Sequence, residues 1–474
     1  MRPFRPTAVL LACLALAACA HVRKADVRLP QAFEAPQGAA GAVALDRWWL
    51  TFNDPELTAL IDQALVANPD AKSAAARLAE ARAASLSALT RFLPQGDATG
   101  STRRTTTSQL AGTQINIPGF ATSGVSTSEA ANFNVSWEVD LFGRLFAVGK
   151  AARGDVAAAR FSYEGARASL AAQVADAYFQ ARGLAIQLAD ARETARIERS
   201  LFDLATKRAE AGLSATSEPD RVAGDLGQAD AQAAGLEAEL QVQRRTLLIL
   251  AGRTIEPTAN LVVTPVVGVI PPVPASTPSE LLIRRPDVRE AQARVVSATG
   301  RLDLAGLGFF PTLTFSPTLG WAKSVQPGFS ATTQSWSLGG SITQPILSIP
   351  RLLADMKAQS ARTEQAVDAY EKAVQTAFSE SEAALVRLDS DRRRVVLLTA
   401  GEARSARAYE AARTGYARGL TDLQTALSTE QSWRGARTQL TSAQVQALRR
   451  AVQAYKALGG GWPSDASPST AQAR

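Results

Sequence analysis

The chain has 474 residues, of which 46% are hydrophobic, 20% charged and 6% aromatic, and its formal net charge is +7 at pH 7. This length is too great for one ordinary compact core, and the small aromatic content favours long helices with narrow apolar seams. The basic excess is scattered along the chain, whereas nucleic-acid binders gather their charge in a patch or stripe, so we expect no nucleic-acid partner.

The reactive side chains are confined to the start of the chain. Both cysteines, Cys13 and Cys19, and the one histidine, His21, lie within the first 21 residues. The rest of the sequence therefore offers no disulfide, no thiolate or imidazole metal ligand and no cysteine nucleophile. It also lacks a glycine-rich phosphate loop and a Ser-His-Asp arrangement. We predict no catalytic residues, no metal site and no cofactor, and therefore no enzyme.

Residues 1–18 have the pattern of a signal peptide, because Arg2 and Arg5 precede an apolar stretch that is too short to span a bilayer. The stretch ends in Leu16-Ala17-Ala18-Cys19, which resembles the lipobox of bacterial lipoproteins. That resemblance implies that Cys19 becomes the first residue of the mature chain and carries a covalent lipid such as palmitate. By the same resemblance, Ala20 permits sorting to the outer membrane. The alternative is an ordinary signal peptide with an incidental cysteine.

A lipidated lead-in over residues 19–55 precedes a helical pattern from Glu56 to about Arg91, in which apolar residues recur at spacings of three and four. Phe92-Leu93-Pro94 ends that helix. Residues from about 95 to 140 are rich in Thr, Ser, Gly and Asn and are expected to hold strands. Near their end, apolar and polar residues alternate with the period of a strand, the apolar ones being Phe133, Val135, Trp137 and Val139.

The longest helical pattern runs from Leu141 to about Ala211, which is about 105 Å if the helix is unbroken. Gly212-Leu213 interrupts it, and a second helix is expected to reach about Leu250, where Gly252 ends it. Residues 253–279 are a linker rich in Pro and Val without helical periodicity.

The second half repeats this order of elements. A helix is expected from Pro286 to Leu307, and strands within about 312–343, where apolar residues again alternate with Ser and Thr. A very long helix then runs from Arg351 to about Arg418, Gly419-Leu420 interrupts it, and a last helix reaches Leu458. Residues 459–474 form a C-terminal tail.

The two halves superimpose at a shift of 207 residues, which places Arg144-Leu145 on Arg351-Leu352 and Gly212-Leu213 on Gly419-Leu420. The sequence therefore predicts one duplicated unit of helix, strand, strand, long helix, breaker and helix. The first repeat covers residues 56–252 and the second covers residues 280–458.

Four amphipathic strands cannot close a barrel alone, and a membrane does not tolerate open sheet edges, so several chains must pool their strands. The Ser/Thr side would face a wet lumen and the apolar side would face lipid. The alternative is the core of a soluble sandwich. The candidates for the outward face or an aromatic girdle are Phe133, Trp137, Trp321 and Trp336.

With these features, the chain resembles the TolC-type outer-membrane efflux family, and more narrowly its lipoprotein branch, the NodT-like components of RND efflux pumps. The resemblance extends over nearly the whole mature chain. The motifs that carry it are Phe52-Asn53-Asp54-Pro55-Glu56-Leu57 with Leu60-Ile61, Trp137-Glu138-Val139-Asp140-Leu141-Phe142-Gly143-Arg144, Arg284-Arg285-Pro286-Asp287-Val288, and Tyr455-Lys456-Ala457-Leu458-Gly459-Gly460-Gly461-Trp462.

The resemblance implies a mainly α fold with a membrane β-barrel part. A homotrimer would form a 12-stranded β-barrel in the outer membrane and a 12-helix α-barrel that extends into the periplasm. The partners implied are outer-membrane lipid, a periplasmic adaptor (membrane fusion) protein and an inner-membrane RND-type pump. The function implied is passive conduction of small toxic compounds or drugs to the exterior.

The resemblance also implies roles for the two interruptions, as hairpin tips that contact the adaptor. The tip residues are Ala211, Gly212, Leu213 and Ser214 in the first half, and Arg418, Gly419, Leu420 and Thr421 in the second. Alternatively, the Gly-Leu pairs are only turns.

Relatives often carry an aspartate in the aperture after the second tip, but here Ser428 stands at that position and Asp422 and Glu430 are the nearest acids. This departure puts an acidic gate in doubt. Tyr416 would either latch the closed aperture or pack between helices.

Two other functions stay open at this point. One is the exit duct of a type I protein secretion system, and the other is a periplasmic coiled-coil lipoprotein without a pore.

Overall fold

The computed structural model describes residues 23–35, 45–108, 110, 124–212, 215–272 and 276–463. The chain divides into two compact units. The sheet unit consists of Met1–Ala25, Ala79–Ala158 and Gln292–Ala369, and the hairpin unit consists of Asp26–Leu78, Ala159–Ala291 and Tyr370–Arg474. Within the described part of the chain, no helix combines the length and the hydrophobicity that crossing a bilayer would require.

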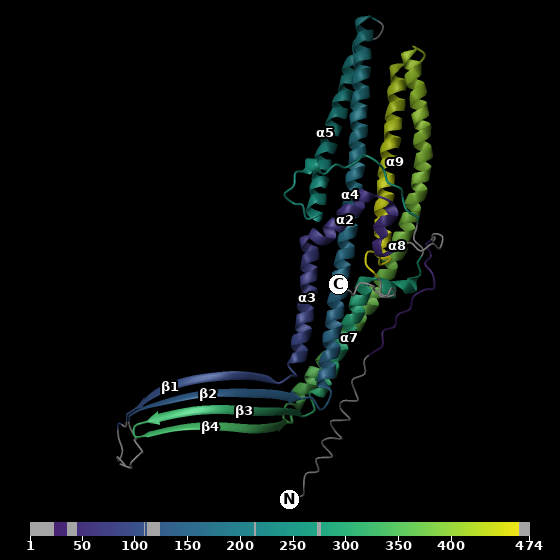
Figure 1. The fold of residues 1–474 in the computed structure, drawn as a ribbon. Coiled ribbons are helices and arrows are strands. Elements are labelled where there is room, and N and C mark those ends of the chain that lie inside the picture. Colours follow the sequence, from purple (N-terminus) through teal and green to yellow (C-terminus); the bar gives the residue numbers. More distant parts are fainter. Residues whose placement is uncertain are drawn as a thin grey trace. The chain divides into compact units, whose positions relative to one another are not determined.

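The sheet unit is built around four strands, β1 (Gln95–Thr107), β2 (Gly124–Val139), β3 (Thr312–Gln326) and β4 (Phe329–Thr343). They lie side by side in the order β1-β2-β3-β4, and all neighbouring pairs are antiparallel (Figure 1). The central pair, β2 and β3, joins the two halves of the sequence. The two strands predicted for each half are therefore confirmed, and they form one continuous sheet.

The sheet has one apolar and one polar face, because residues directly opposite each other share a face. On the apolar face, the register aligns Ala98, Phe133, Leu319 and Trp336 in one row. On the other face, Asn134 and Thr318 lie in the row that continues to Ser337. The register therefore places the alternating apolar residues of the neighbouring strands on one face and the polar residues on the other.

Helices α4 (Arg144–Glu210) and α7 (Pro286–Leu307) approach each other closely in the sheet unit. A Cβ atom added to Gly300 would lie 2.5 Å from the backbone nitrogen of Ala151, and one added to Gly154 would lie 2.5 Å from that of Ser297. Neither space can hold a side chain. The two glycines therefore set the distance between these helices.

Replacing Gly300 by valine is expected to force α4 and α7 apart and to destabilise the sheet unit by about 1–3 kcal/mol, the usual cost of overpacking. Thermal unfolding in detergent, followed by circular dichroism, measures the change. Gly306→Val is the matched control on the same helix, because an added Cβ there meets nothing within 4 Å. Equal melting temperatures for the two variants would contradict the close approach.

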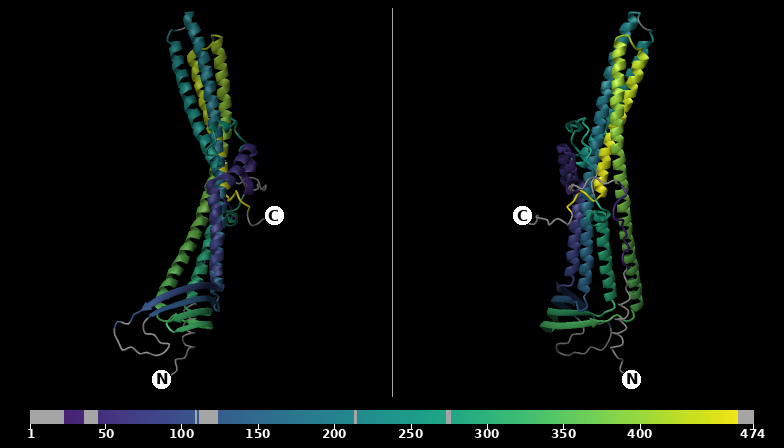
Figure 2. Two further views of the ribbon diagram at one scale, coloured as in Figure 1. Left: turned by 60° about the vertical axis from the view of Figure 1, so that its left-hand side comes forward. Right: turned by 90° about the vertical axis from the view of Figure 1, so that its right-hand side faces the viewer.

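The hairpin unit contains most of α4, together with α5 (Glu218–Leu250), α9 (Leu423–Ala457) and most of α8 (Ile349–Ala417). Figure 2 shows α4 beside α5 and α8 beside α9 in both views, so that the chain forms two helical hairpins. The shorter elements are η1 (Leu45–Phe52), α2 (Pro55–Ala67), η2 (Thr258–Asn260), η3 (Pro278–Glu280) and α6 (Leu281–Arg284).

The duplication is visible in how these helices end. Gly212 and Gly419 have φ values of +69° and +73°, and Gly252 and Gly459 have φ values of +73° and +80°. Each pair is related by the shift of 207 residues found in the sequence. A left-handed residue after the last helical turn is a common helix stop, which glycine adopts without steric cost.

One helix expected from the sequence is wrong. The pattern predicted an unbroken helix from Glu56 to about Arg91, but the structure has two helices, α2 and α3 (Pro69–Thr90). The break lies at Asn68, whose ψ of 132° is extended, because the ring of Pro69 disfavours a helical conformation in the residue before it. The Asn68 side chain stabilises the break: it accepts from the backbone nitrogen of Asp70 at 2.7 Å and donates to the Leu250 carbonyl at 2.9 Å.

The main core of the hairpin unit contains a cluster of aromatic side chains. Trp48 is fully buried and stacks on Tyr455, with ring centroids 5.8 Å apart and planes 7° from parallel. Phe52 lies edge-on to both rings and also contacts Phe179 at a centroid distance of 5.0 Å. This cluster joins η1 near the start of the chain to α9 near its end.

Candidate functional site

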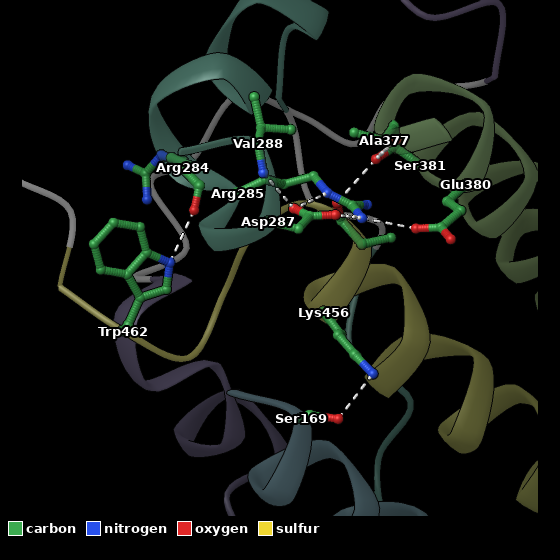
Figure 3. Close-up of polar contacts among 11 residues, drawn as sticks. Ser169, Arg284, Arg285, Asp287, Val288, Ala377, Glu380, Ser381, Lys456 and Trp462 are labelled. Carbon is green, nitrogen blue, oxygen red and sulfur yellow. Dashed lines mark hydrogen bonds and ion pairs between the residues drawn. The ribbon is translucent and has the colours of Figure 1, made fainter. Parts of the chain in front are cut away.

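Three of the four sequence motifs meet in the hairpin unit. Figure 3 shows Arg285 between α7, α8 and the end of α9. Its guanidinium donates to both carboxylate oxygens of Asp287 at 3.0 and 2.6 Å, to Glu380 at 2.7 Å and to the carbonyl of Ala457 at 3.0 Å. Its side chain is only 9% exposed, so the Arg-Arg-Pro-Asp motif supplies a buried polar anchor for the last turn of α9.

The C-terminal motif packs on the same anchor. The indole nitrogen of Trp462 donates to the carbonyl of Arg284 at 2.8 Å, as Figure 3 shows. A Cβ atom on Gly459 would lie 2.6 Å from that carbonyl oxygen, so the glycine is required both for its positive φ and for its close contact.

The Phe-Asn-Asp-Pro motif also has a structural role. The Asp54 carboxylate caps α2 by accepting from the backbone nitrogens of Glu56 and Leu57 at 3.1 and 3.2 Å. It also accepts from the Tyr178 hydroxyl at 3.1 Å and forms an ion pair with Arg182 at 2.6 Å. The capping carboxylate therefore joins α2 to α4.

The remaining motif, Trp137 to Arg144, lies in the sheet unit where β2 leads into α4. Asp140 accepts hydrogen bonds from four successive backbone nitrogens, those of Phe142, Gly143, Arg144 and Leu145, at 2.7 to 3.2 Å. Trp137 donates to the carbonyl of Phe92 at 2.9 Å. These contacts satisfy the first turn of a 67-residue helix, so this motif also has a structural role.

The four girdle candidates share the apolar face of the sheet. Phe133, Trp137 and Trp336 are exposed by 46%, 38% and 78%, and Trp321 is half-buried. Phe133 and Trp336 lie in one row, and Trp321 lies in the next row towards the β3-β4 turn. Large exposed aromatic rings need a cover, and contact with lipid stays a prediction for all four.

The second predicted tip is a tight helix stop. The backbone nitrogen of Leu420 donates to the carbonyl of Gly415 at 2.8 Å, and that of Gly419 donates to Tyr416 at 3.0 Å, which is a Schellman motif. Thr421 folds back to donate to the carbonyl of Ala412 at 3.1 Å. Leu420 is 77% exposed, and Arg418 is exposed beside it, so both side chains are available to a partner.

At the first tip, Gly212 has a positive φ as Gly419 does, and its backbone nitrogen donates to the carbonyl of Ala209 at 3.0 Å. Ala211 is exposed beside it. Leu213 and Ser214 lie outside the described residues, and so does the predicted lipidation site, Cys19. Contact of either tip with an adaptor stays a prediction.

Tyr416 is buried in a small cluster just inside the tips. The Arg208 guanidinium lies over its ring, 5.1 Å from the centroid, so the ends of α4 and α8 contact each other here. Tyr416 therefore packs between helices, and a latch role stays a prediction. The apolar residues that complete the cluster are Ala205, Val222, Leu423, Ala426 and Leu427.

Of the other gate candidates, Asp422 is the N-cap of α9 and accepts from the backbone nitrogen of Thr425 at 2.7 Å. The hydrogen bond from the Thr425 side chain lowers the pKa of Asp422, and this backbone hydrogen bond lowers it further. Ser428 is exposed and donates to the carbonyl of Thr425 at 3.1 Å. Their local contacts are those of helix ends, and a role at an aperture stays a prediction for both.

An acid cluster that the sequence reading missed lies farther along these helices. Glu198 of α4 and Glu430 of α9 are both fully buried, and Arg434 donates to Glu198 at 3.2 Å and lies 3.7 Å from Glu430. Burial raises the pKa of Glu430 to about 7, and the Glu198 carboxyl adds to the rise while Arg434 opposes it. Burial likewise raises the pKa of Glu198.

A signal for this cluster was present in the sequence. The apolar stripe of α9 begins with Leu423, Ala426 and Leu427, and Glu430 follows Leu427 by three residues. Helical spacing therefore places this acid on the apolar stripe. Glu198 continues Ala191 and Ala195 of α4 in the same way. An acid in an apolar stripe is the more informative observation, because acids are rarely buried without a partner.

The acid cluster is one end of a longer seam between α4 and α9. Ion pairs join Asp190 to Arg437 at 2.6 Å and Asp176 to Arg449 at 2.7 Å, so α4 supplies the acids and α9 the bases. Between them, Gly183 faces Val445, whose methyl group would lie 2.8 Å from an added Cβ. This seam connects the two hairpins over much of their length.

The described residues contain no group of three or more potential metal ligands. The carboxylates described above cap helices, pair with arginines or belong to the buried acid cluster. The features that can carry a function are the sheet with one apolar and one polar face, the tips of the two hairpins, and the charged seam between α4 and α9.

Known proteins that resemble this chain in sequence are outer-membrane efflux proteins. The sequence pattern of the outer membrane efflux protein family matches residues 60–253 and 277–460. The pyoverdine export outer membrane protein OpmQ of Pseudomonas aeruginosa is 28% identical over 468 residues, which cover 96% of this chain and 97% of that protein. The cation efflux system protein CusC of Escherichia coli is 27% identical over 466 residues, which cover 96% and 98%.

Solved structures share the fold. The outer-membrane channel OprN superimposes with a TM-score of 0.79 at 26% identity, covering 94% of this chain and 100% of its own. The open state of the MtrE outer membrane channel of Neisseria gonorrhoeae gives 0.80 at 24% identity, covering 94% and 99%.

Proposed function

The chain belongs to the outer membrane efflux protein family, and we propose that three copies of it pool their strands into one barrel that conducts small molecules out of the cell. Membership makes it an outer-membrane component of an efflux system. The main support for a trimeric channel is the sheet itself, which has two open edges, one apolar face and one polar face.

Among the described residues, each chain leaves two long sheet edges without a partner. These edges belong to β1, which has 13 residues, and to β4, which has 15. In hydrocarbon, every unpaired backbone group costs several kcal/mol, so a lone four-stranded sheet is excluded there. Three copies would supply 12 strands, an even number within the range of closed membrane barrels.

The apolar face covers most of the height of the apolar band in membrane barrels. Its rows extend from Val139, opposite Leu313, to Ala131, opposite Trp321, which is about 27 Å along the strand. Strands tilted by about 40° reduce this to about 20 Å of thickness, close to the band of about 25 Å in such barrels. The next row pairs Glu129 with Lys323, so the face becomes charged where the apolar band ends.

The helical hairpins would form the periplasmic part of the duct. We propose that the two tips contact a periplasmic adaptor, which joins the duct to an inner-membrane RND-type pump. The exposed Arg418 beside the exposed Leu420 supports this assignment, because arginine is enriched among the residues that contribute most to protein interfaces. The chain itself would supply no energy and no chemistry.

The cargo is proposed to be small and chemically diverse. Relatives are named for pyoverdine export, solvent efflux, toluene efflux and cation efflux. These names favour small compounds over the protein cargo of a type I secretion system. Family membership also favours a duct over a coiled-coil lipoprotein without a pore.

A covalent lipid on Cys19 is proposed as a second attachment to the outer membrane. Leu16-Ala17-Ala18-Cys19 is the support for this proposal. Two or three acyl chains would anchor the chain firmly, since each buried CH₂ contributes about 0.8 kcal/mol.

Single-channel recording in planar bilayers tests the proposal. The purified protein is expected to give discrete conductance steps, and Leu420→Cys is expected to cross-link to the adaptor in intact cells. Val242→Cys is the control, because that α5 residue is 61% exposed but distant in sequence from either tip. Absence of conductance at all pH values, from protein with native circular dichroism, would refute the channel.

A further inference from the structure

Two carboxylic acids from different hairpins are buried next to each other in the hairpin unit. Glu198 belongs to the first hairpin and Glu430 to the second, and neither has any exposed surface. Burying a carboxylate costs free energy unless it is paired and hydrogen-bonded, and two neighbouring carboxylates cannot both ionise without strong repulsion.

The available base does not neutralise both acids. Arg434 donates one hydrogen bond, to Glu198, and its 3.7 Å approach to Glu430 is an ion pair without a hydrogen bond. Both Glu430 oxygens and the second Glu198 oxygen lack a hydrogen-bond partner among the described residues. A proton on one carboxyl would supply the missing donor, because a protonated acid can donate to its neighbour.

The surroundings add negative charge. Asp225 of α5 disfavours ionisation of both acids, and the Tyr409 hydroxyl group approaches from α8. Tyr409 itself stacks on Trp433 of α9, with centroids 5.2 Å apart. Among the described residues, the groups that act on the pair are therefore the acid Asp225, the neutral phenol of Tyr409 and the base Arg434.

We propose that Glu198, Glu430 and Arg434 form a proton-operated latch that holds the two hairpins together along the α4–α9 seam. With one proton on the acid pair, the carboxyls share a hydrogen bond and Arg434 balances the remaining charge. When that proton is lost, a buried negative charge is left uncompensated. Separation of α4 from α9 at this point then admits water and relieves the repulsion.

The direction of the pH effect follows from proton linkage. In the open form the acids are hydrated, and their pKa returns towards the ordinary 4.5, whereas burial in the closed form raises that of Glu430 to about 7. The closed form therefore holds more protons between these values and loses stability as pH rises through them. For one proton, the open population rises by up to about tenfold per pH unit and levels off above about pH 7.

Only the effect of the latch on conduction rests on the proposed function. Because the seam lies between the hairpins that carry the two tips, loosening it would lower the barrier to moving one tip away from the other. The latch would thus bias the periplasmic end of the duct towards opening as the proton leaves. The contact itself can be tested without any channel measurement.

Hydrogen exchange of the amides in residues 195–205 and 426–436, corrected for intrinsic rates, tests the latch between pH 5 and 8. In the wild-type protein, protection is expected to fall by up to about tenfold per pH unit up to about pH 7. Glu430→Gln and Glu198→Gln remove the titrating pair, so each is expected to keep protection nearly constant over this range. Glu410→Gln is the control, because that exposed α8 acid pairs with Arg413 and is not a member of the buried cluster. It should behave as the wild type does.

Wild-type protection that does not change with pH would overturn the latch, and so would glutamine variants that keep the wild-type pH dependence. Loss of protection at every pH in both glutamine variants would also overturn it, because an uncharged pair would then fail to hold the seam. Channel recordings separate this inference from the proposed function. Conduction with pH-independent exchange refutes the latch alone, and pH-dependent exchange without conduction refutes the channel alone.

Discussion

Trp48→Ala is expected to lower the free energy of unfolding by about 4 kcal/mol. Trp48 is fully buried and contacts Trp49, Phe52 and Tyr455, with ring centroids 5.7 to 6.0 Å apart. Its indole nitrogen has no hydrogen-bond partner among the described residues, so the loss comes from packing and from the cavity that remains. Urea-induced loss of helical circular dichroism in detergent measures it.

The neighbouring Leu50→Ala is the matched control, because Leu50 is 46% exposed on the same short helix. We expect that variant to lose less than about 1 kcal/mol. Similar losses for the two variants would show that the aromatic cluster is not the centre of the hairpin unit.

The second large effect is expected at Arg285. Its replacement by methionine keeps most of the side-chain volume but removes the hydrogen bonds to Asp287, Glu380 and the Ala457 carbonyl. Net hydrogen bonds to charged groups contribute about 1.5–3 kcal/mol each, but Asp287 and Glu380 are half exposed and can regain water. We therefore expect a total loss of about 3 kcal/mol, measured by the same urea titration.

Arg284→Met is the control for this change. Within the described part of the chain, the Arg284 side chain pairs with Asp46 at 3.9 Å and is 28% exposed, so its loss should cost less than about 1 kcal/mol. If both arginine variants had the same midpoint, the adjacent arginines would be equivalent and the polar anchor described for Arg285 would be wrong.

Local sequence patterns predicted the elements well because the fold is duplicated. The same breaker appears at Gly212 and Gly419, and the structure gives both a positive φ. The alternation in the strands predicted the two faces of the sheet, since register preserves parity. The error at Asn68 arose because helical spacing of apolar residues was weighed without the restriction that Pro69 places on its neighbour.

The sites were harder to predict because their residues meet only in three dimensions. Arg285 and Ala457, or Asp54 and Arg182, are far apart in the sequence, and each motif alone shows no partner. The acid cluster forms only when two helices are aligned. In the sequence, Glu430 is one of the acids nearest to a tip, whereas in the structure it lies beside Glu198. Side-chain pairing across helices depends on rotation and register, which apolar periodicity fixes only within about one residue.

The two units differ in the side chains that they expose and bury. The sheet unit carries the exposed aromatic face, and the hairpin unit carries charged seams and buried polar anchors. Such a chain has one part suited to lipid and one part suited to water.

The most direct test of the account is the native mass of the protein extracted from outer membranes in mild detergent. We predict three copies of one chain in a single complex, each carrying a lipid on Cys19, because only pooled strands satisfy the open edges of β1 and β4. A stable, folded monomer that remains in the outer membrane would contradict the account, since one four-stranded sheet would then be sufficient on its own.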